Sequence, residues 1–135
     1  MTYTIGDLLV SQIANTDSTV SSEPEYVQGD IWIANLEDKA LGHEQGGNRP
    51  ILIISDTSWN RKSKTPICVI CTTSEKKGRN RYCVKIRAHP KLSFANGSQL
   101  YTLDNSRLLH RVGKTSRSKL LEVRKIINKL LWVSK

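Results

Sequence analysis

Residues 42–55 read Gly42-His43-Glu44-Gln45-Gly46-Gly47-Asn48-Arg49-Pro50-Ile51-Leu52-Ile53-Ile54-Ser55. Apolar runs at 30–36 and 51–54 have the length and composition of strands, so the glycine-rich part is a loop between them. Paired glycines allow positive φ and let a ligand approach the backbone closely. Arg49 lies where the loop meets the second strand, a position that can aim its guanidinium at a phosphate. A hairpin loop with a surface salt bridge between Glu44 and Arg49 explains the same residues equally well.

Charge divides this chain of 135 residues, a length that suits one domain, into two unequal parts. Residues 1–59 hold two basic and nine acidic residues, whereas residues 60–135 hold nineteen basic and three acidic ones. An excess of this size in the second part favours an anionic partner, and RNA or DNA is the first candidate. A solvated basic face is the alternative.

Membrane and secretory signals are missing from the sequence. No run approaches the roughly 18 apolar residues of a membrane span, and the N-terminus lacks the pattern of a signal peptide. We therefore expect a cytoplasmic protein with no membrane contact. Cys68 and Cys71 lie three apart in a strand-like segment and point to opposite faces, so they are not expected to share a metal. Together with Cys83 they make three cysteines, an odd number that does not suit a disulfide framework. Buried free thiols are expected instead.

The sequence changes character near residue 27. Residues 1–27 form an acidic N-terminal extension, with a possible short helix at 1–14 and a linker-like stretch at 15–25. Residues 28–135 form a mainly β domain. Strands are expected at 28–36, 50–56, 66–73, 81–87, 99–104 and 107–112, a polar loop at 56–65, a basic turn at 75–81 and an amphipathic helix from Ser116 onward. Short strands followed by one helix indicate a small, strongly bent sheet closed by that helix.

Five short motifs are spread over about residues 28–133. They are Gly29-Asp30-Ile31-Trp32, Glu44-Gln45-Gly46-Gly47-Asn48-Arg49-Pro50, Asn60, Cys71-Thr72-Thr73-Ser74 and Leu103-Asp104-Asn105-Ser106-Arg107. Together they resemble the MazF/PemK family of toxin endoribonucleases, the mRNA interferases of type II toxin–antitoxin systems. The resemblance implies a small SH3-like barrel with a C-terminal helix, assembled as a two-fold homodimer. It also implies RNA bound along the dimer interface and a cognate antitoxin that blocks that groove.

Two features depart from the family pattern. Asn105 stands where members usually carry Gln, which is one methylene longer, so base recognition is expected to differ. The acidic extension of residues 1–27 lies outside the usual pattern. Residues 1–25 carry four acidic residues and no basic one, so we hypothesise that they partly shield the RNA groove. A free tail, or a helix packed elsewhere on the barrel, is the alternative.

The expected chemistry needs no metal, because RNA supplies its own nucleophile in the 2′-OH. Cleavage then leaves a 2′,3′-cyclic phosphate and a 5′-OH. The predicted catalytic residues are Glu44, Arg49 and Thr72. Arg49 donates paired hydrogen bonds to the phosphate and Thr72 adds one more, whereas Glu44 orients Arg49 or takes the proton. The family assigns acid–base work to the arginine, but a guanidinium is a poor base, so we assign it charge stabilisation first. The sequence holds no motif of metal-ligand spacing, so no metal and no cofactor are expected.

The predicted RNA contacts combine polar loop residues with the basic turn. They are Gln45, Asn48, Trp59, Asn60, Thr73, Ser74, Lys76, Lys77, Arg79, Arg81, Asn105 and Arg107. Trp59 fits packing against the barrel equally well, and any one of the cations can be solvated surface charge. Two other classes of function stay open. One is a non-catalytic barrel that binds protein, as relatives that poison gyrase do; the other is a plain nucleic-acid-binding module.

Overall fold

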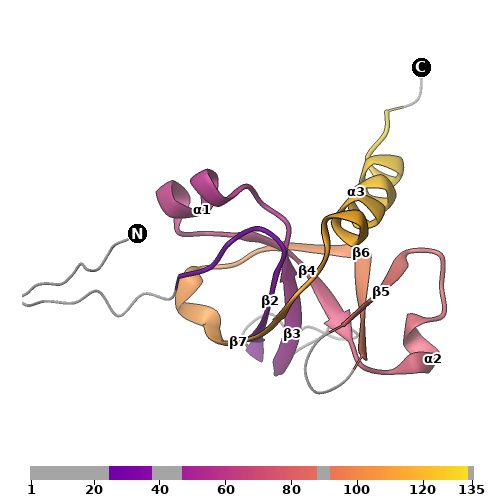
Figure 1. Ribbon diagram of the computed structural model, residues 1–135, viewed down its shortest axis with the longest axis horizontal. Helices are drawn as coiled ribbons and strands as arrows, with labels where there is room; N and C mark the ends of the chain where they lie inside the picture. The colour runs from indigo at the N-terminus through magenta and orange to yellow at the C-terminus, as the bar shows by residue number, and fades with distance from the viewer. Residues whose placement is uncertain (1–24, 38–46, 88–91, 134–135) are drawn as a thin grey trace, which may run out of the picture.

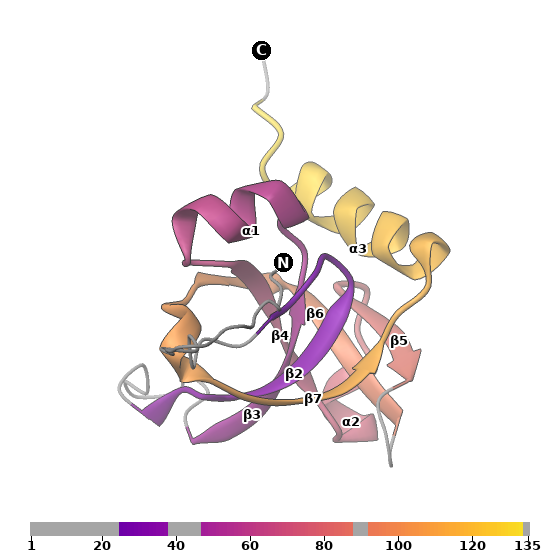
Figure 2. The same cartoon turned by 60° about the vertical axis from the view of Figure 1, so that its left-hand side comes forward.

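The computed structural model describes residues 25–37, 47–87 and 92–133. Within these ranges, six strands form one antiparallel sheet that curls strongly, in the order β5-β6-β4-β3-β2-β7 (Figure 2). The strands are β2 (Asp30–Asn35), β3 (Asn48–Ile53), β4 (Ile67–Thr72), β5 (Cys83–Arg87), β6 (Leu92–Thr102) and β7 (Leu108–Lys114). The helical elements are α1 (Thr57–Ser63), α2 (Glu75–Gly78), η2 (Asn105–Arg107) and α3 (Arg117–Leu130). The expected bent sheet with a C-terminal helix is confirmed.

The helices gather at two ends of the curled sheet. In both Figure 1 and Figure 2, α1 and α3 lie above the end that β3 reaches at Ile53, whereas α2 lies at the opposite end. Because β3 enters from the α2 end and leaves toward α1, its first and last residues belong to different surfaces of the protein. This polarity decides which predicted site residues can meet.

Apolar side chains alternate along the strands and build a cluster on each face of the sheet. On β3, Ile51 and Ile53 belong to one cluster and Leu52 to the other. On β4, Cys68 belongs to the first cluster and Cys71 to the second, which confirms that the two thiols point to opposite faces. The second cluster is covered by α3, whose Val123 is fully buried.

Two elements differ from the sequence-based expectation. The expected polar loop at 56–65 contains α1, because the Asp56 carboxylate accepts the backbone N–H groups of Ser58 and Trp59 and caps a short helix. β6 begins at Leu92 and not near residue 99. Its first half is rich in small and polar residues, so it lacks the alternation of apolar and polar residues by which a strand is recognised in a sequence. The possible helix at 1–14 lies outside the described residues.

The Gly29-Asp30-Ile31-Trp32 motif has a structural role at the start of β2. Gly29 has a φ of 95°, which favours glycine over other residues, and its carbonyl accepts the N–H of Thr115 at 2.9 Å. The buried Asp30 carboxylate accepts the N–H of Val27 at 3.0 Å and the indole N–H of Trp32 at 3.4 Å. Arg111 on β7 also contacts Asp30, at 3.4 Å. The motif therefore fixes where the sheet begins.

Candidate active site

Arg49 and Thr72 come together because of the β3–β4 register. Ile51 pairs with Ile70, so continuing the antiparallel register by two residues on each strand brings Arg49 opposite Thr72. Facing residues in antiparallel strands point to the same side, with Cβ atoms about 4.5–5.5 Å apart. The sequence separates these two residues by 22 intervening positions, and the sheet makes them neighbours at the end that carries α2.

Arg49 is half-buried and holds a donor without a partner. Among the described residues, its Nε is the one buried side-chain nitrogen or oxygen with no hydrogen-bond partner. Burial raises the pKa of the nearby Cys71 thiol, and the positive charge of Arg49 acts in the opposite direction on that pKa. An unsatisfied buried donor is costly, so such an atom is a natural contact for a bound anion.

Thr72 is a donor held in a fixed position. Its side chain is largely buried, and its Oγ1 accepts the N–H of Ser74 at 3.1 Å, which leaves the hydroxyl hydrogen free to donate. Thr73, the next residue, is exposed beyond the end of β4. The Ser74 hydroxyl in turn accepts the N–H of Lys77 at 3.2 Å and caps α2. Thr72 thus stands between the strand and a short basic helix.

Two predicted cations lie on α2 at this end of the sheet, and two more lie in the segment that leads from α2 to β5. Lys76 and Lys77 lie on α2, and Arg79 and Arg81 follow it, all with exposed or half-exposed side chains. Glu75 lies 3.7 Å from Arg79 in a largely exposed pair, and such pairs are weak.

Arg107 reaches the same end from η2. It donates from Nη1 to the carbonyl of Asn35 at 3.1 Å, and Asn35 pairs with Asn48, the neighbour of Arg49. Asn48 itself is exposed at the start of β3. The structure therefore brings cations from two sequence regions toward the Arg49–Thr72 pair.

Lys85 is a cation that sequence reasoning missed. Phe94 pairs with Thr72 on one side and with Lys85 on the other, so all three point to the same face of the sheet. The Phe94 ring packs against Gly78 of α2, and Lys85 is exposed beyond it. Val84 and Ile86 alternate with two cations in β5, and this pattern indicates a strand with Lys85 on its exposed face. The position of that strand beside β6 did not follow from the sequence.

Trp59 does not lie beside Arg49. It is 48% exposed on α1, which follows the end of β3, whereas Arg49 lies at the start of that strand. The two ends of β3 are separated by about 16 Å at roughly 3.3 Å per residue. α1, which carries Trp59, lies at the same end of the sheet as α3 (Figure 2).

The structure corrects the prediction for Asn60. Its side chain is 2% exposed, donates from Nδ2 to the Ser55 carbonyl at 3.1 Å and accepts the Ser55 hydroxyl. Its backbone carbonyl also accepts the Tyr26 hydroxyl at 3.3 Å. Asn60 therefore joins α1 to the sheet and is not available to contact RNA.

Three further predicted residues fall into two groups. Asn105 is 7% exposed at the start of η2, where its N–H donates to the Lys64 carbonyl at 3.0 Å, so little of it is open to a base. Glu44 and Gln45 lie outside the described residues. Among the residues that are described, no three histidine, cysteine or acidic side chains gather as a metal site, and no helix is long and apolar enough to cross a membrane.

A sequence profile described as PemK-like, MazF-like toxin of type II toxin–antitoxin systems matches residues 27–131. The chain belongs to this family. An endoribonuclease MazF from Staphylococcus epidermidis is 34% identical to this toxin over 100 residues, which cover 71% of the toxin and 82% of that protein. The endoribonuclease PemK of Escherichia coli is 37% identical over 54 residues, so the match spans 40% of the length of each chain. These names confirm the predicted enzyme class.

Solved structures agree with the fold of the toxin. MazF from Deinococcus radiodurans superposes with a TM-score of 0.71 at 25% identity, covering 84% of this toxin and all of that chain. A MazE–MazF structure from the same organism gives a TM-score of 0.68 at 26% identity, covering 83% and 100%. The predicted family and barrel fold are therefore confirmed.

Proposed function

We propose that this toxin is a metal-independent endoribonuclease that cleaves single-stranded RNA at selected sequences and so stops translation and growth. The 2′-OH of the ribose attacks the adjacent phosphorus, and the bond to the 5′ oxygen of the next nucleotide breaks. The products are a 2′,3′-cyclic phosphate and a 5′-OH. The observation that carries the proposal is the buried, unpartnered Nε of Arg49 opposite Thr72.

Arg49 stabilises the charge that builds up on the phosphate oxygens. Its Nε and one Nη donate a parallel pair of hydrogen bonds, and the Thr72 hydroxyl adds a neutral donor from the facing strand. Both groups are held by regular secondary structure, so little reorganisation is needed when the charge develops. This arrangement suits a transition state better than a neutral ground state.

Proton transfer is assigned to Glu44 at the 2′-OH, and water supplies the proton that the departing 5′ oxygen takes up. Glu44 precedes Arg49 by five positions, and it orients the guanidinium or accepts the 2′-OH proton. A guanidinium stays protonated at neutral pH, so Arg49 serves as a hydrogen-bond donor close to the leaving oxygen and not as the base.

The RNA strand follows the basic end of the sheet. Lys76 and Lys77 on α2, together with Arg107 beside Asn35, offer phosphate contacts on either side of the Arg49–Thr72 pair. Asn48, Thr73 and Ser74 lie at the same end and supply polar contacts to ribose or base edges, while Arg79 and Arg81 extend the cationic surface.

The toxin acts as a homodimer, and a cognate antitoxin neutralises it. Leu131, Trp132 and Val133 after α3 are 65–83% exposed, a large apolar surface for a single chain and a fitting interface between two copies. The similar MazF from D. radiodurans has been solved with MazE, which supports an antitoxin partner here. The antitoxin would cover the cationic RNA surface.

Incubation with a long RNA in EDTA tests the proposal. The expected result is discrete fragments with 2′,3′-cyclic phosphate ends, and loss of these fragments for Arg49→Ala. Arg61→Ala is the matched control, because Arg61 is an exposed arginine on α1 at the other end of the sheet. Intact RNA with the wild-type toxin, or equal cleavage by the Arg49→Ala toxin, contradicts the proposal.

A further inference from the structure

A groove lies beside α3, at the end of the sheet opposite Arg49. Its volume is about 380 Å³, and α3 contributes one helical stripe to it at spacings of three and four residues. The lining residues are Gln28, Ile54, Arg117, Leu120, Leu121, Arg124 and Ile127. The floor is therefore apolar and the rim carries two arginines.

The two arginines on the rim have no acidic partner within the described ranges. The ion pairs there involve Glu75, Asp30 and Glu122, and neither Arg117 nor Arg124 takes part. Leu121 between them is 45% exposed. Apolar surface between two free cations fits a segment with clustered apolar residues and acidic side chains.

The chain itself contains such a segment before its first described residue. Ile5-Gly6-Asp7-Leu8-Leu9-Val10 is apolar with one acid, and Ile13 follows at helical spacing from Leu9. Residues 1–24 carry three acidic side chains and no basic one. Their composition therefore complements both the floor and the rim of the groove.

The chain enters the domain beside this groove. Residue 25 is the first described residue, and Gln28 lines the groove while its Nε2 donates to the Ile54 carbonyl at 2.7 Å. Residues 14–24 can span about 35 Å when extended. Returning from residue 25 to Gln28 takes at most about 11 Å, and the α3 stripe from Arg117 to Ile127 is about 15 Å long. The linker is long enough to place residues 5–13 anywhere along the groove.

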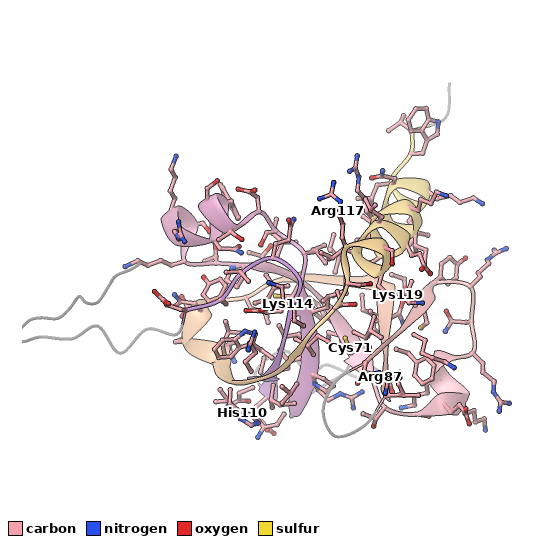
Figure 3. All side chains as sticks on the ribbon, viewed as in Figure 1. Cys71, Arg87, His110, Lys114, Arg117 and Lys119 are labelled. Carbon is pink, nitrogen blue, oxygen red and sulfur yellow. The ribbon has the colours of Figure 1, made fainter. Side chains whose placement is uncertain are left out.

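We propose that residues 5–13 bind the α3 groove of their own chain, with the apolar side chains on Leu120, Leu121 and Ile127 and the single carboxylate, Asp7, between Arg117 and Arg124. The bound extension is held far from the active site. Figure 3 places Arg117 at the α3 end and Arg87 and His110 at the opposite end of the sheet. The extension thus does not shield the RNA surface, which is the outcome opposite to the shielding hypothesis from the sequence.

Photo-crosslinking in the full-length toxin tests this placement. The toxin carries p-benzoylphenylalanine in place of Leu9, is irradiated, and is mapped by peptide mass spectrometry. The expected crosslinks join residue 9 to peptides of residues 117–127 in a product with the mass of one chain. Crosslinks to β3, α2 or the Arg49 end support shielding and overturn the proposal. A product of twice the mass shows binding to another copy and also overturns it.

Charge reversal provides the matched control. Arg117→Glu with Arg124→Glu is expected to lower the crosslink yield roughly tenfold, because the attraction of both arginines for Asp7 is replaced by repulsion. Lys125→Glu with Lys129→Glu makes the same change in net charge on the same helix outside the groove, and its yield is expected to stay near wild type. If both double variants lose crosslink yield equally, the yield depends only on net charge, and this outcome contradicts binding in the α3 groove. Circular dichroism of each variant verifies that α3 is intact.

Discussion

The β3–β4 register, when continued two residues past the Ile51–Ile70 pair, places Arg49 on β3 opposite Thr72 on β4. One brings a charged donor whose Nε has no partner, and the other brings a hydroxyl fixed by the N–H of Ser74. Because strand pairing sets their separation, this geometry exists before any RNA binds. The variants below separate the contribution of each group.

Arg49→Lys tests the fork geometry of the guanidinium. Lysine keeps the charge but removes Nε and the parallel pair of donors, so we expect kcat to stay roughly 100-fold below wild type, near the loss typical of one removed transition-state donor. Single-turnover cleavage of a short RNA gives the rate. Arg61→Lys on α1 is the control, and near-complete activity of the Arg49→Lys toxin means that charge alone suffices.

Thr72→Ala is expected to reduce turnover more than RNA binding, whereas Thr73→Ala is expected to have a smaller effect on both. Thr72 is buried beside Arg49 and Thr73 is exposed beyond the strand. Thr72→Ser keeps the hydroxyl and should recover most of the turnover. Rates at saturating RNA and affinities by fluorescence anisotropy separate the two quantities. A larger loss of turnover for Thr73→Ala would reverse the assignment of the donor.

Lys85 is expected to contact a phosphate of bound RNA, because it lies on the same face as Thr72 across Phe94. Lys85→Ala should lower affinity for every RNA sequence and reduce the slope of log affinity against log salt by about 0.7, the value for one lost contact to a single strand. Affinity measured between about 50 and 200 mM salt gives the slope. Lys129→Ala on α3 is the control, and an unchanged slope for Lys85→Ala removes Lys85 from the RNA path.

The three thiols are expected to react at different rates. Burial raises the pKa of Cys68 to about 12 and raises the pKa of Cys71 as well, so neither forms thiolate near pH 8. Burial also raises the pKa of Cys83, which is only half-buried. Iodoacetamide at pH 8 should modify Cys83 first and slowly, and all three after unfolding. Mass spectrometry identifies the sites, and rapid modification of Cys71 in the native toxin is inconsistent with its burial.

Gly78→Ala is expected to destabilise the toxin and weaken cleavage together. A Cβ at this position would lie 2.2 Å from the Phe94 ring, and Phe94 pairs with Thr72. Overpacking of this kind costs about 1–3 kcal/mol. Urea unfolding measures the free-energy change, and cleavage rates of the folded fraction report on Thr72. A fully stable variant would show that α2 shifts away from the sheet without cost.

The sequence predicted the β-rich domain and the C-terminal helix, because apolar alternation and helical periodicity are local signals; the roles of Arg49 and Thr72 stay predictions. The pairing of Arg49 with Thr72 was not visible, since strand register depends on contacts between distant segments. The prediction of Asn60 as an RNA contact does not fit its burial, for a related reason. Asn60 is a polar residue whose hydrogen bonds to Ser55 lie inside the protein, and sequence alone does not distinguish an internal amide from an exposed one.

The outer strands of the open sheet, β5 and β7, have a consequence for the behaviour of the toxin at high concentration. An unpaired strand edge is a template on which further chains can add and polymerise. Lys85 and Arg87 project from β5, and Lys114 from β7. Like charges on both borders repel a second sheet that approaches side by side, so aggregation through these strands is disfavoured. Lys85, which is expected to contact RNA, thus also helps to keep the toxin from forming fibres before its antitoxin arrives.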